Sequence, residues 1–257
     1  MKNEYLKQFT LFEEQAKLLG YEERYPHTLE TLFECLKDWS LIMNLEEVKS
    51  WIEKIKNETN FNVIKIPINK LRDWQVDKRT GNITHFSKDF FIVHGIRANI
   101  ESREVGNRGW DQPIISQVGH DGGILGLIRK RIDGIPHYLC EAKAEPGNFG
   151  KIQISPTLQA TFSNLRKSHG GRKPLFCDFF ENTQNYSDVK ILYESWLAED
   201  GGRLYLKRNK AMLIELDENY KLEKPENFVW LSLYQIKALV SENSIINPHI
   251  RGILFHA

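Results

Sequence analysis

Hydrophobic residues recur at helical spacing through the first 60 residues of the chain. The stretch 28–39 carries apolar side chains three or four positions apart, at Leu29, Leu32, Phe33, Leu36 and Trp39. The stretch 44–58 repeats this spacing at Leu45, Val48, Trp51, Ile52 and Ile55. A stripe with this period is typical of an amphipathic helix that packs against a core. Residues 1–60 are therefore predicted to form a helical N-terminal region.

From residue 61 onward, short β-branched or alternating runs replace the helical period. These runs predict strands at 63–68, 90–93, 124–128, 138–144, 151–154, 190–196, 203–207 and 211–216. Turn signals such as Asp133-Gly134 separate them. One helix is predicted to begin at Ser155-Pro156 and end at Gly170-Gly171, and another begins at Ser232, which forms a capping-box pattern with Gln235. Residues 61–257 are therefore predicted to form one α+β domain.

Charge and hydropathy narrow the classes of partner. The chain has 35 Lys and Arg residues against 34 Asp and Glu residues, so its net charge of +1 gives no electrostatic footprint for a nucleic acid or an anionic membrane. Apolar runs such as 211–216 fall far short of the roughly 20 residues needed to cross a bilayer. The first nine residues lack the apolar core of a signal peptide. We expect a cytoplasmic protein with no nucleic-acid or membrane partner.

The common cofactor and metal signatures do not occur in the sequence. Cys35, Cys140 and Cys177 lie far apart, and the eight histidines show no metal-binding spacing. Neither the dinucleotide-binding glycine pattern nor the phosphate-binding P-loop occurs. The segment "SREVG" at 102–106 is similar to the Arg-Glu core of the Nudix hydrolase motif, but the acidic pair that would hold magnesium does not follow it. We therefore predict no metal and no cofactor.

Charged side chains alternate along the predicted strand 136–145. A period of two places Tyr138, Cys140, Ala142 and Ala144 on the core side, and places on the other side His137, Leu139, Glu141, Lys143 and Glu145. Lys143 lies between Glu141 and Glu145, so it can keep both carboxylates ionised or tune one of them. The simplest interpretation is a solvated strand face with cross-strand ion pairs.

Uncharged polar residues next to this strand favour a second interpretation. The turn at 146–148 would return Gln153 and Ser155 beside Lys143 and Glu145. The helix predicted after Ser155 would then present Gln159, Ser163 and Asn164 away from its apolar stripe. Hydrogen-bonding groups that converge on two carboxylates and an amine are typical of a sugar-binding cleft.

Six motifs in unbroken order resemble one enzyme family. The run "GIPHYLCEAKAEPGN" followed by "QISPTLQATFSN" resembles the core motif of the NDP-hexose 2,3-dehydratases, which act in deoxysugar biosynthesis. The resemblance extends over residues 63–254, through "IPINKLRDW", "GNITHFSKDFFIVHGIR", "WDQPII", "EDGGRLYLKRNKAMLIE" and "FVWLSLYQIKALV" with "NPHIRGIL". The chain is identified by these motifs as a member of that family with a single repeat.

The resemblance implies a fold and an assembly. Members of the family have a Nudix-hydrolase-like mixed β-sheet domain with flanking helices and without the hydrolytic metal motif. They typically carry two copies of the domain, whereas this sequence carries one copy of each motif. A homodimer in which each subunit keeps its own active site is therefore expected. Glu141 stands where the longer members more often have Gln.

The implied reaction needs no cofactor. The family eliminates water across C2–C3 of a nucleotide-linked 4-keto-6-deoxyhexose, usually linked to dTDP, and forms a 3,4-diketo-2,6-dideoxy sugar. The C4 ketone of the substrate acidifies the C3 proton and serves as the electron sink. The protein then supplies a base near C3, an acid near the C2 hydroxyl and donors toward the developing enolate.

Roles for individual residues follow from the resemblance and from their positions. The candidate catalytic residues are Glu145, Lys143 beside it, and Glu199 before the turn at 200–202. Candidate hexose or phosphate contacts are Gln153, Thr157, Gln159, Ser163 and Asn164, and candidate diphosphate ligands are Arg166, Arg208 and Asn209. Trp110 and Gln112 are candidates for stacking on and hydrogen-bonding the base.

Several of these assignments have a structural alternative. Glu199 is equally well explained as a hairpin residue, Arg166 as a solvated helix end and Trp110 as a core residue. His85 and Ser87 are either loop organisers or ligands. For the whole protein, the main alternative is a catalytically silent sugar-nucleotide-binding or regulatory module. The missing acidic cluster disfavours a second alternative, a diphosphohydrolase.

Overall fold

The computed structural model describes residues 2–22, 27–99, 109–118, 122–167 and 172–255. The N-terminal region is helical as predicted, with α1 (Lys2–Leu18), α2 (Thr28–Glu34) and α3 (Leu45–Glu58). Asn44 and Glu47 form a capping box at the start of α3. The predicted stripe in 28–39 is partly wrong: Leu32 within α2 is exposed, and Leu36 is exposed beyond the end of the helix at Glu34. In the described part of the chain, every helix is too short or too polar to pass through a membrane.

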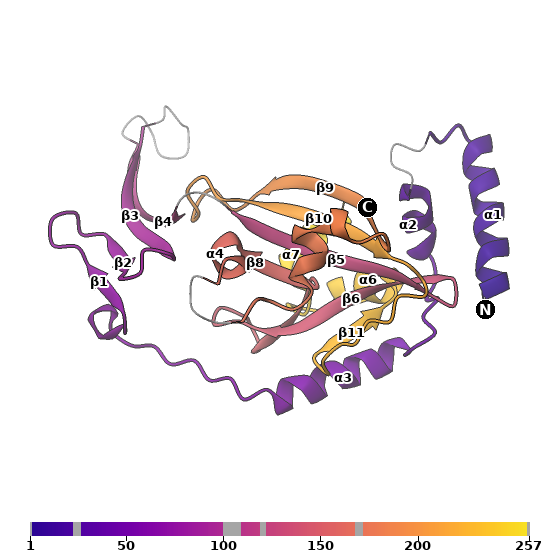
Figure 1. Cartoon of the computed structure of the whole chain (residues 1–257), viewed down its shortest axis with the longest axis horizontal. Coiled ribbons are helices and arrows are strands. Elements are labelled where there is room, and N and C mark those ends of the chain that lie inside the picture. The colour runs from indigo at the N-terminus through magenta and orange to yellow at the C-terminus, as the bar shows by residue number, and fades with distance from the viewer. Residues whose placement is uncertain (1, 23–26, 100–108, 119–121, 168–171, 256–257) are drawn as a thin grey trace.

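Residues 59–67 run in an extended conformation from α3 toward a separate small sheet (Figure 1). The strand predicted at 63–68 does not form, because the described residues provide no neighbouring strand to pair with it. Its apolar side chains are exposed, namely those of Val63, Ile64, Ile66 and Ile68. The last of these begins the short 3-10 helix η1 (Ile68–Lys70).

The small sheet is four-stranded and antiparallel. Its strands are β1 (Trp74–Val76), β2 (Ile83–His85), β3 (Phe91–Ala98) and β4 (Trp110–Gln117), in that order. Strand β4 is attached to the loop 203–205, because the Ile115 N–H donates to Arg203 O at 2.9 Å and the Tyr205 N–H donates to Ile115 O at 2.8 Å. The strand predicted at 203–207 is therefore wrong: this segment forms turns with one isolated bridge, between Leu204 and Ile115.

The central sheet has seven strands in a mixed arrangement. They are β5 (Gly123–Ile132), β6 (Ile135–Ala144), β7 (Ile152–Ser155), β8 (Leu158–Thr161), β9 (Val189–Ala198), β10 (Arg208–Leu216) and β11 (Phe228–Leu231). The order is β11-β6-β5-β10-β9, with β7 beside β6 and β8 beside β5. Only β5 and β10 pair in parallel among the described strands. The predicted α+β class is confirmed.

Strands β5 and β6 pair only over part of their length and then separate. Their pairing runs from Ile132 and Ile135 to Ile128 and Leu139. Beyond that point Thr157 bridges the gap, because its Oγ1 accepts from the Ile128 N–H at 2.9 Å and donates to Leu139 O. The separated ends pair instead with β8 and β7, and residues of β6 and β8 line a pocket there.

The helix predicted to begin at Ser155 is wrong at its start. Ser155 belongs to β7, and residues 158–161 form β8, because Leu158 and Ala160 alternate inward and the edge of β5 is open to pairing. The helix α4 (Phe162–Leu165) begins only at its cap, Thr161. The predicted end at Gly170-Gly171 lies outside the described residues.

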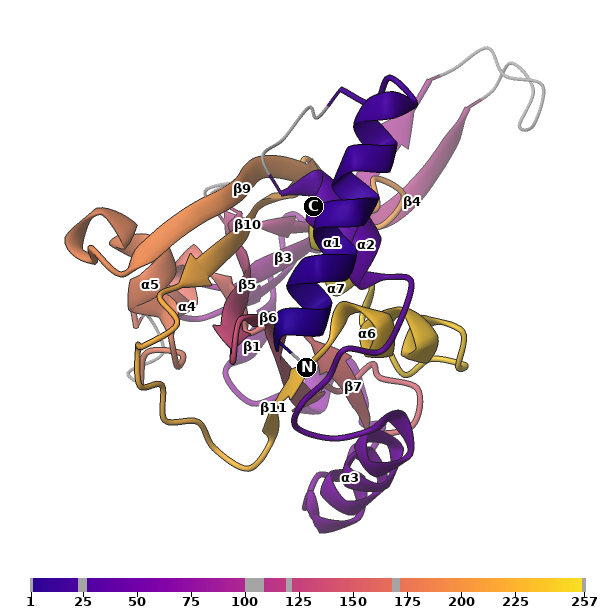
Figure 2. The ribbon, with the colours of Figure 1, turned by 90° about the vertical axis from the view of Figure 1, so that its right-hand side faces the viewer.

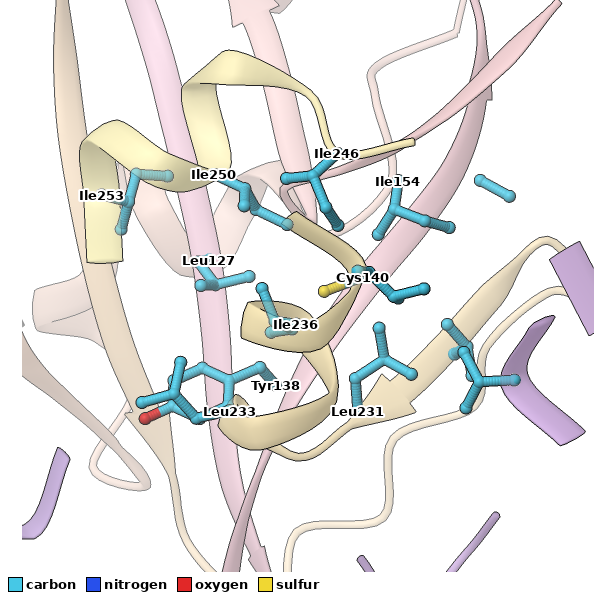
Figure 3. Packing of buried hydrophobic residues seen from close by; sticks show 14 of the residues in the cluster. Leu127, Tyr138, Cys140, Ile154, Leu231, Leu233, Ile236, Ile246, Ile250 and Ile253 are labelled. Atoms are coloured by element: carbon cyan, nitrogen blue, oxygen red, sulfur yellow. The ribbon is translucent and has the colours of Figure 1, made fainter. Parts of the chain in front are cut away.

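Two hydrophobic cores lie on opposite faces of the central sheet. One contains Tyr138 and Cys140 of β6, packed against Ile236 of α6 (Leu233–Val240) and Ile250 of α7 (Pro248–Leu254), as Figure 3 shows. The other contains Leu139, together with α5 (Cys177–Glu181). The 3-10 helix η3 (Thr183–Asn185) follows α5. The predicted core side of β6 is confirmed, and the predicted charged side is open only beyond Leu139, because His137 and Leu139 are also buried.

A buried ion network attaches the N-terminal helices to the central sheet. The guanidinium of Arg129 on β5 contacts Glu30 at 2.6 Å, Glu34 at 2.8 Å and also Glu215. Arg131 pairs with Glu30 at 2.7 Å. We call these five residues the Arg129 cluster. Figure 2 shows α1 and α2 beside each other on this side of the molecule.

Candidate functional site

The three candidate catalytic residues lie at one edge of the central sheet. Lys143 is near the end of β6 and Glu145 follows that strand. Glu199 follows the end of β9, and its neighbouring strand β10 begins with Arg208 and Asn209. Because β9 and β10 are antiparallel, the end of one strand meets the beginning of the other.

Gln159 of β8 holds the first two of these residues. Its side-chain amide donates to Glu145 Oε1 at 3.1 Å, and its backbone oxygen accepts from Lys143 Nζ at 3.2 Å. The turn after β6 is fixed by Asn148, whose side-chain amide donates to Lys143 O at 3.0 Å. The predicted return of β7 is confirmed in part: Gln153 pairs with Lys143 as expected, but Ser155 pairs with Glu141 and not with Glu145.

His249 joins Glu199 to the rest of the site. The Nδ1 atom of His249 lies 3.7 Å from Glu199 Oε1, and the Asn209 side-chain amide donates to the same oxygen. Burial lowers the pKa of His249, while the charges of Glu199 and Glu145 oppose this shift and those of Lys143 and Lys207 add to it. The two carboxylates and the two ammonium groups therefore all lie close enough to His249 to influence its protonation. We call this set the acid–base cluster, consisting of Lys143, Glu145, Gln159, Glu199, Asn209 and His249.

The sequence analysis did not single out His249. A signal was present in the last motif, where Asn247 precedes Pro248 and His249. Asn is a good helix cap and Pro favours the first helical position, so this order predicts a helix start. In the structure, Asn247 caps α7 and its side chain accepts from the His249 N–H, which places His249 in the first turn.

Two pockets lie beside the acid–base cluster: Lys143 and Gln159 line the first, and the second is lined by Lys207, whose backbone oxygen accepts from the Glu199 N–H at 3.0 Å. The first, which we call the polar pocket, has a volume of about 310 Å³ and is lined by Glu141, Lys143, Thr157, Leu158, Gln159, Asn164, Pro174, Leu175, Asn227 and Phe228. The second, which we call the apolar pocket, has a volume of about 320 Å³ and is lined by Asp89, Phe90, Phe91, Ile115, Gln117, Thr161, Ser163, Asn164, Leu204 and Lys207. Asn164 lines both pockets, so they meet beside α4.

Glu141 lies within the polar pocket. Its Oε1 accepts from the Asn227 side-chain amide at 3.3 Å. Burial raises the pKa of Glu141, and Glu145 adds to this shift, whereas Lys143 and the hydrogen bond from Asn227 oppose it. The carboxyl is therefore closer to protonation than an exposed glutamate.

Several other predicted contacts also line the pockets. Thr157 is almost fully buried and bridges β5 and β6, so its hydroxyl is engaged within the sheet. The Ser163 hydroxyl lies 2.8 Å from the Thr161 hydroxyl, and the Asn164 N–H donates to the same Thr161 oxygen at 3.3 Å. Ser163 and Asn164 thus stand at the start of α4, next to both pockets.

The remaining predicted ligands are placed elsewhere. Gln153 donates to Ser244 O at 3.0 Å and lines a groove next to α3. Trp110 donates to Gln112 at 2.7 Å, and Gln112 donates to Gly202 O at 2.7 Å, at the end of β4 opposite to Gln117. Neither Trp110 nor Gln112 is among the residues that line the two pockets.

The predicted arginines lie at the margin of the site. Arg208 lies over the ring of Trp196, with its guanidinium carbon 4.6 Å from the ring centroid. Arg166 is the C-terminal cap of α4 and stands two residues after Asn164. Both arginines therefore lie near the pockets but outside their lining residues.

A group with metal-like spacing occurs on α5, away from the acid–base cluster. Cys177, Asp178 and Glu181 bring ligand atoms together there. Lys173 pairs with Asp178 at 3.4 Å and with Glu181 at 3.1 Å, so its ammonium group already balances the charge of these two carboxylates. The segment "SREVG" lies outside the described residues.

Solved structures show weak similarity to this chain. A diadenosine tetraphosphate (Ap4A) hydrolase from C. elegans matches with 14% identity and a TM-score of 0.30, over 52% of this chain and 91% of that chain. A hydrolase of ADP compounds matches with 11% identity and a TM-score of 0.36, over 76% and 94%. Both TM-scores are below 0.5, so the α+β class rests on the helices and strands described above.

Curated relatives match more closely. A dTDP-4-dehydro-6-deoxy-alpha-D-glucopyranose 2,3-dehydratase from Saccharopolyspora spinosa is 36% identical over 208 residues, which are 81% of this chain and 41% of the relative. Enzymes with the same name from Amycolatopsis orientalis and Streptomyces violaceoruber are 35% and 31% identical, over 82% and 80% of this chain. The chain spans between 41% and 44% of the length of these relatives.

The family model described as NDP-hexose 2,3-dehydratase matches residues 45–256. This range contains the small sheet, the central sheet, the acid–base cluster and both pockets. The chain therefore belongs to the NDP-hexose 2,3-dehydratase family.

Proposed function

We propose that this protein is an enzyme that eliminates water across C2–C3 of a dTDP-linked 4-keto-6-deoxyhexose. Family membership and the names of the curated relatives support the reaction. The observation that carries the proposal is the acid–base cluster, in which Lys143 and Glu145 at the end of β6, Glu199 after β9 and His249 of α7 come from three separate segments to one end of the sheet. Two pockets next to this cluster provide room for a sugar nucleotide.

The elimination of water uses two proton transfers, one from C3 and one to the C2 hydroxyl. A base removes the C3 proton, which the C4 ketone acidifies, and the electron pair moves into an enolate. The enolate expels the C2 hydroxyl, which takes a proton and leaves as water. The resulting enol accepts a proton at C2, releases the proton of its C3 hydroxyl and becomes the 3,4-diketo-2,6-dideoxy sugar. Each well-placed proton-transfer group contributes on the order of 10² to 10⁴ in rate.

The residues of the cluster suit these steps. Glu145 is the proposed base, because Gln159 fixes one carboxylate oxygen and leaves the other to accept a proton. Lys143 stands beside it as a cation that stabilises the enolate. Glu199 and His249 form the second proton-transfer pair, because they lie 3.7 Å apart and the imidazole has a lowered pKa.

The products of one incubation test this proposal. The full chain is incubated with dTDP-4-keto-6-deoxyglucose and a reductase that traps the unstable diketone. A 2-deoxy product is expected. Release of dTMP would show a hydrolase, and unchanged substrate would show a binding module, so either result would overturn the dehydratase.

We also propose that the protein acts as a homodimer in which each subunit keeps its own site. The chain spans less than half the length of its curated relatives, and the extended segment 59–67 exposes Val63, Ile64 and Ile66. Light scattering should give twice the chain mass of 30.1 kDa. A monomeric mass at micromolar concentration would refute the dimer. The double change Ile64→Asp and Ile66→Asp tests whether this segment forms the interface.

A cytoplasmic location is proposed as well. The three cysteines, Cys35, Cys140 and Cys177, are free thiols, as is usual in a reducing compartment. Fractionation of cells that express the full chain tests this location. Recovery in the membrane or secreted fraction would contradict it.

A further inference from the structure

Aromatic residues from two of the sequence motifs converge on the apolar pocket. The ring of Trp74, from "IPINKLRDW", has its centroid 4.8 Å from that of Phe91 and 6.0 Å from that of Phe90. The ring of His85 lies 4.4 Å from that of Phe90. Trp74 and His85 therefore support the two phenylalanine rings that line the pocket.

The loop before β3 is fixed by hydrogen bonds. The Ser87 N–H donates to His85 Nδ1 at 3.2 Å, and the Ser87 hydroxyl lies 2.8 Å from the same nitrogen. The Asp89 N–H donates to Ser87 Oγ at 3.2 Å. His85 and Ser87 thus organise the loop that delivers Asp89, Phe90 and Phe91 to the pocket.

The opposite wall of the pocket comes from the central sheet. Leu204 of the β9–β10 connection is bridged to Ile115 of β4, and both side chains line the pocket. Thr161 and Ser163 line it from the end of β8 and the start of α4. The apolar pocket therefore exists only where the small sheet meets the central sheet.

Lys207 lines the apolar pocket and lies next to the acid–base cluster, because its backbone oxygen accepts from the Glu199 N–H at 3.0 Å. Lys207 Nζ donates to Gln117 Oε1, and Gln117 Nε2 donates to Gly122 O at 2.9 Å. Burial lowers the pKa of Lys207, and the negative charge of Glu199, a member of the cluster, opposes this shift. A molecule that reaches from Phe91 to the cluster would pass a cation at the position of Lys207.

We propose that the apolar pocket binds the pyrimidine base and the deoxyribose of the substrate, with the base stacked on Phe91 and the diphosphate beside Lys207. This inference rests on the proposed function, because it takes dTDP as the nucleotide. A base is flat and apolar on its faces, which matches the phenylalanine wall, and an ammonium matches a phosphate. The hexose then lies at the acid–base cluster. Trp110 and Gln112, the sequence-based candidates for this role, lie outside the pocket.

Direct binding of dTDP to the full chain tests the inference. Phe91→Ala should weaken dTDP binding about 10-fold to 100-fold, because a base stacked on an aromatic side chain contributes on the order of 1–3 kcal/mol. Phe91→Tyr, which keeps the aromatic ring, should bind dTDP with an affinity close to that of the wild-type protein. Phe86→Ala is the matched control: Phe86 is 61% exposed in the same loop and lies outside the pocket. Circular dichroism shows whether each variant is folded.

A cross-linking experiment locates the base without a substitution. The photoreactive nucleotide 5-iodo-dUDP should attach to a peptide that contains residues 89–91 or 204–207. Attachment at Trp110, or dTDP binding that is unchanged in Phe91→Ala, would overturn the inference while leaving the dehydratase reaction intact. Wild-type protein that binds dTDP without dehydrating the sugar would refute only the proposed function. No binding of dTDP by the wild-type protein would refute both.

Discussion

Two clusters of charged side chains lie in the same central sheet, and their charges are balanced in different ways. In the Arg129 cluster, opposite charges contact one another directly, and the Arg129 side chain is only 2% exposed. In the acid–base cluster, the carboxylates of Glu145 and Glu199 accept hydrogen bonds from neutral amides. Lys143 and Gln159 of the second cluster line the polar pocket.

This difference separates a structural role from a chemical one. Buried charges that pair with each other hold a docked helix in place, and removing one partner leaves the others uncompensated. Carboxylates that are held by neutral donors keep a lone pair for a proton, which general acid–base chemistry requires. The comparison therefore predicts that substitutions in one cluster change turnover and that substitutions in the other change stability.

The largest effect is expected for Glu145→Gln. The amide keeps one oxygen to accept from Gln159 but cannot take the C3 proton, so kcat should fall on the order of 10²-fold to 10⁴-fold. The dissociation constant of dTDP and the melting temperature should stay close to the wild-type values. Product formation in the reductase-coupled assay is the measurement. Dehydration at the wild-type rate would remove Glu145 from the mechanism.

Arg129→Met should lower the free energy of unfolding by about 3–5 kcal/mol, because Glu30, Glu34 and Glu215 lose their shared cation in a buried site. The matched control is Arg97→Met, which breaks the exposed pair with Asp111 and should leave the free energy of unfolding close to the wild-type value. Urea denaturation measures both. Equal losses in the two variants would contradict the structural role of the Arg129 cluster.

The two clusters should also respond to acid at different pH values. Burial lowers the pKa of His249 below its usual 6.5, so activity should be retained above pH 6.5 and be lost as the pH falls through the lowered value. Burial acts to raise the pKa of Glu30, but Arg131 and Arg129 lower it from 4.5 to about 2. The stability that Glu30 contributes is therefore fully present above pH 4.5 and is lost only as the pH falls toward 2.

Activity and circular dichroism, measured together from pH 7 to pH 3, test this separation. The acidic loss of kcat should precede the loss of ellipticity and should be reversible. The buried His137 also has a pKa below its usual value, so His137→Gln serves as the control for a histidine outside the acid–base cluster. Simultaneous loss of activity and structure would show that one event, unfolding, explains both.

The smallest effect is expected for Glu141→Gln. Burial raises the pKa of Glu141 and so favours its neutral form. The glutamine side chain has nearly the same shape and keeps an oxygen that can accept from Asn227. A change in kcat of about threefold or less is expected, since less than about 1 kcal/mol of barrier is involved. A steady-state comparison at pH 7 measures it. A fall of two orders of magnitude or more would place Glu141 among the reacting groups.

The sequence predicted the elements that depend on local signals. The capping box at Ser232 predicted the start of α6, and the apolar stripe in 44–58 predicted α3, because each signal lies within a few neighbouring residues. The alternation along β6 likewise predicted its core side. The turn after Glu145 was found from Pro and Gly alone.

The wrong predictions concern segments whose neighbours are distant in the chain. Residues 158–161 became a strand because β5 offers an open edge, and residues 63–68 stayed unpaired because no described strand lies beside them. The local strand propensity of a segment does not show whether a partner strand will lie beside it in the fold. His249 was missed for a similar reason: it reaches Glu199 across 50 positions of sequence, and only the packing of α7 brings the two together.

Loss of the C3 proton in heavy water tests the central claim most directly, because it reports the first chemical step. The ¹H NMR signal of C3–H is followed in dTDP-4-keto-6-deoxyglucose, with wild-type protein, Glu145→Gln and Arg129→Met. We predict loss of the signal with the wild-type protein and with folded Arg129→Met, but not with Glu145→Gln. Loss of the C3 signal at the wild-type rate in Glu145→Gln would contradict the assignment of the chemistry to the acid–base cluster.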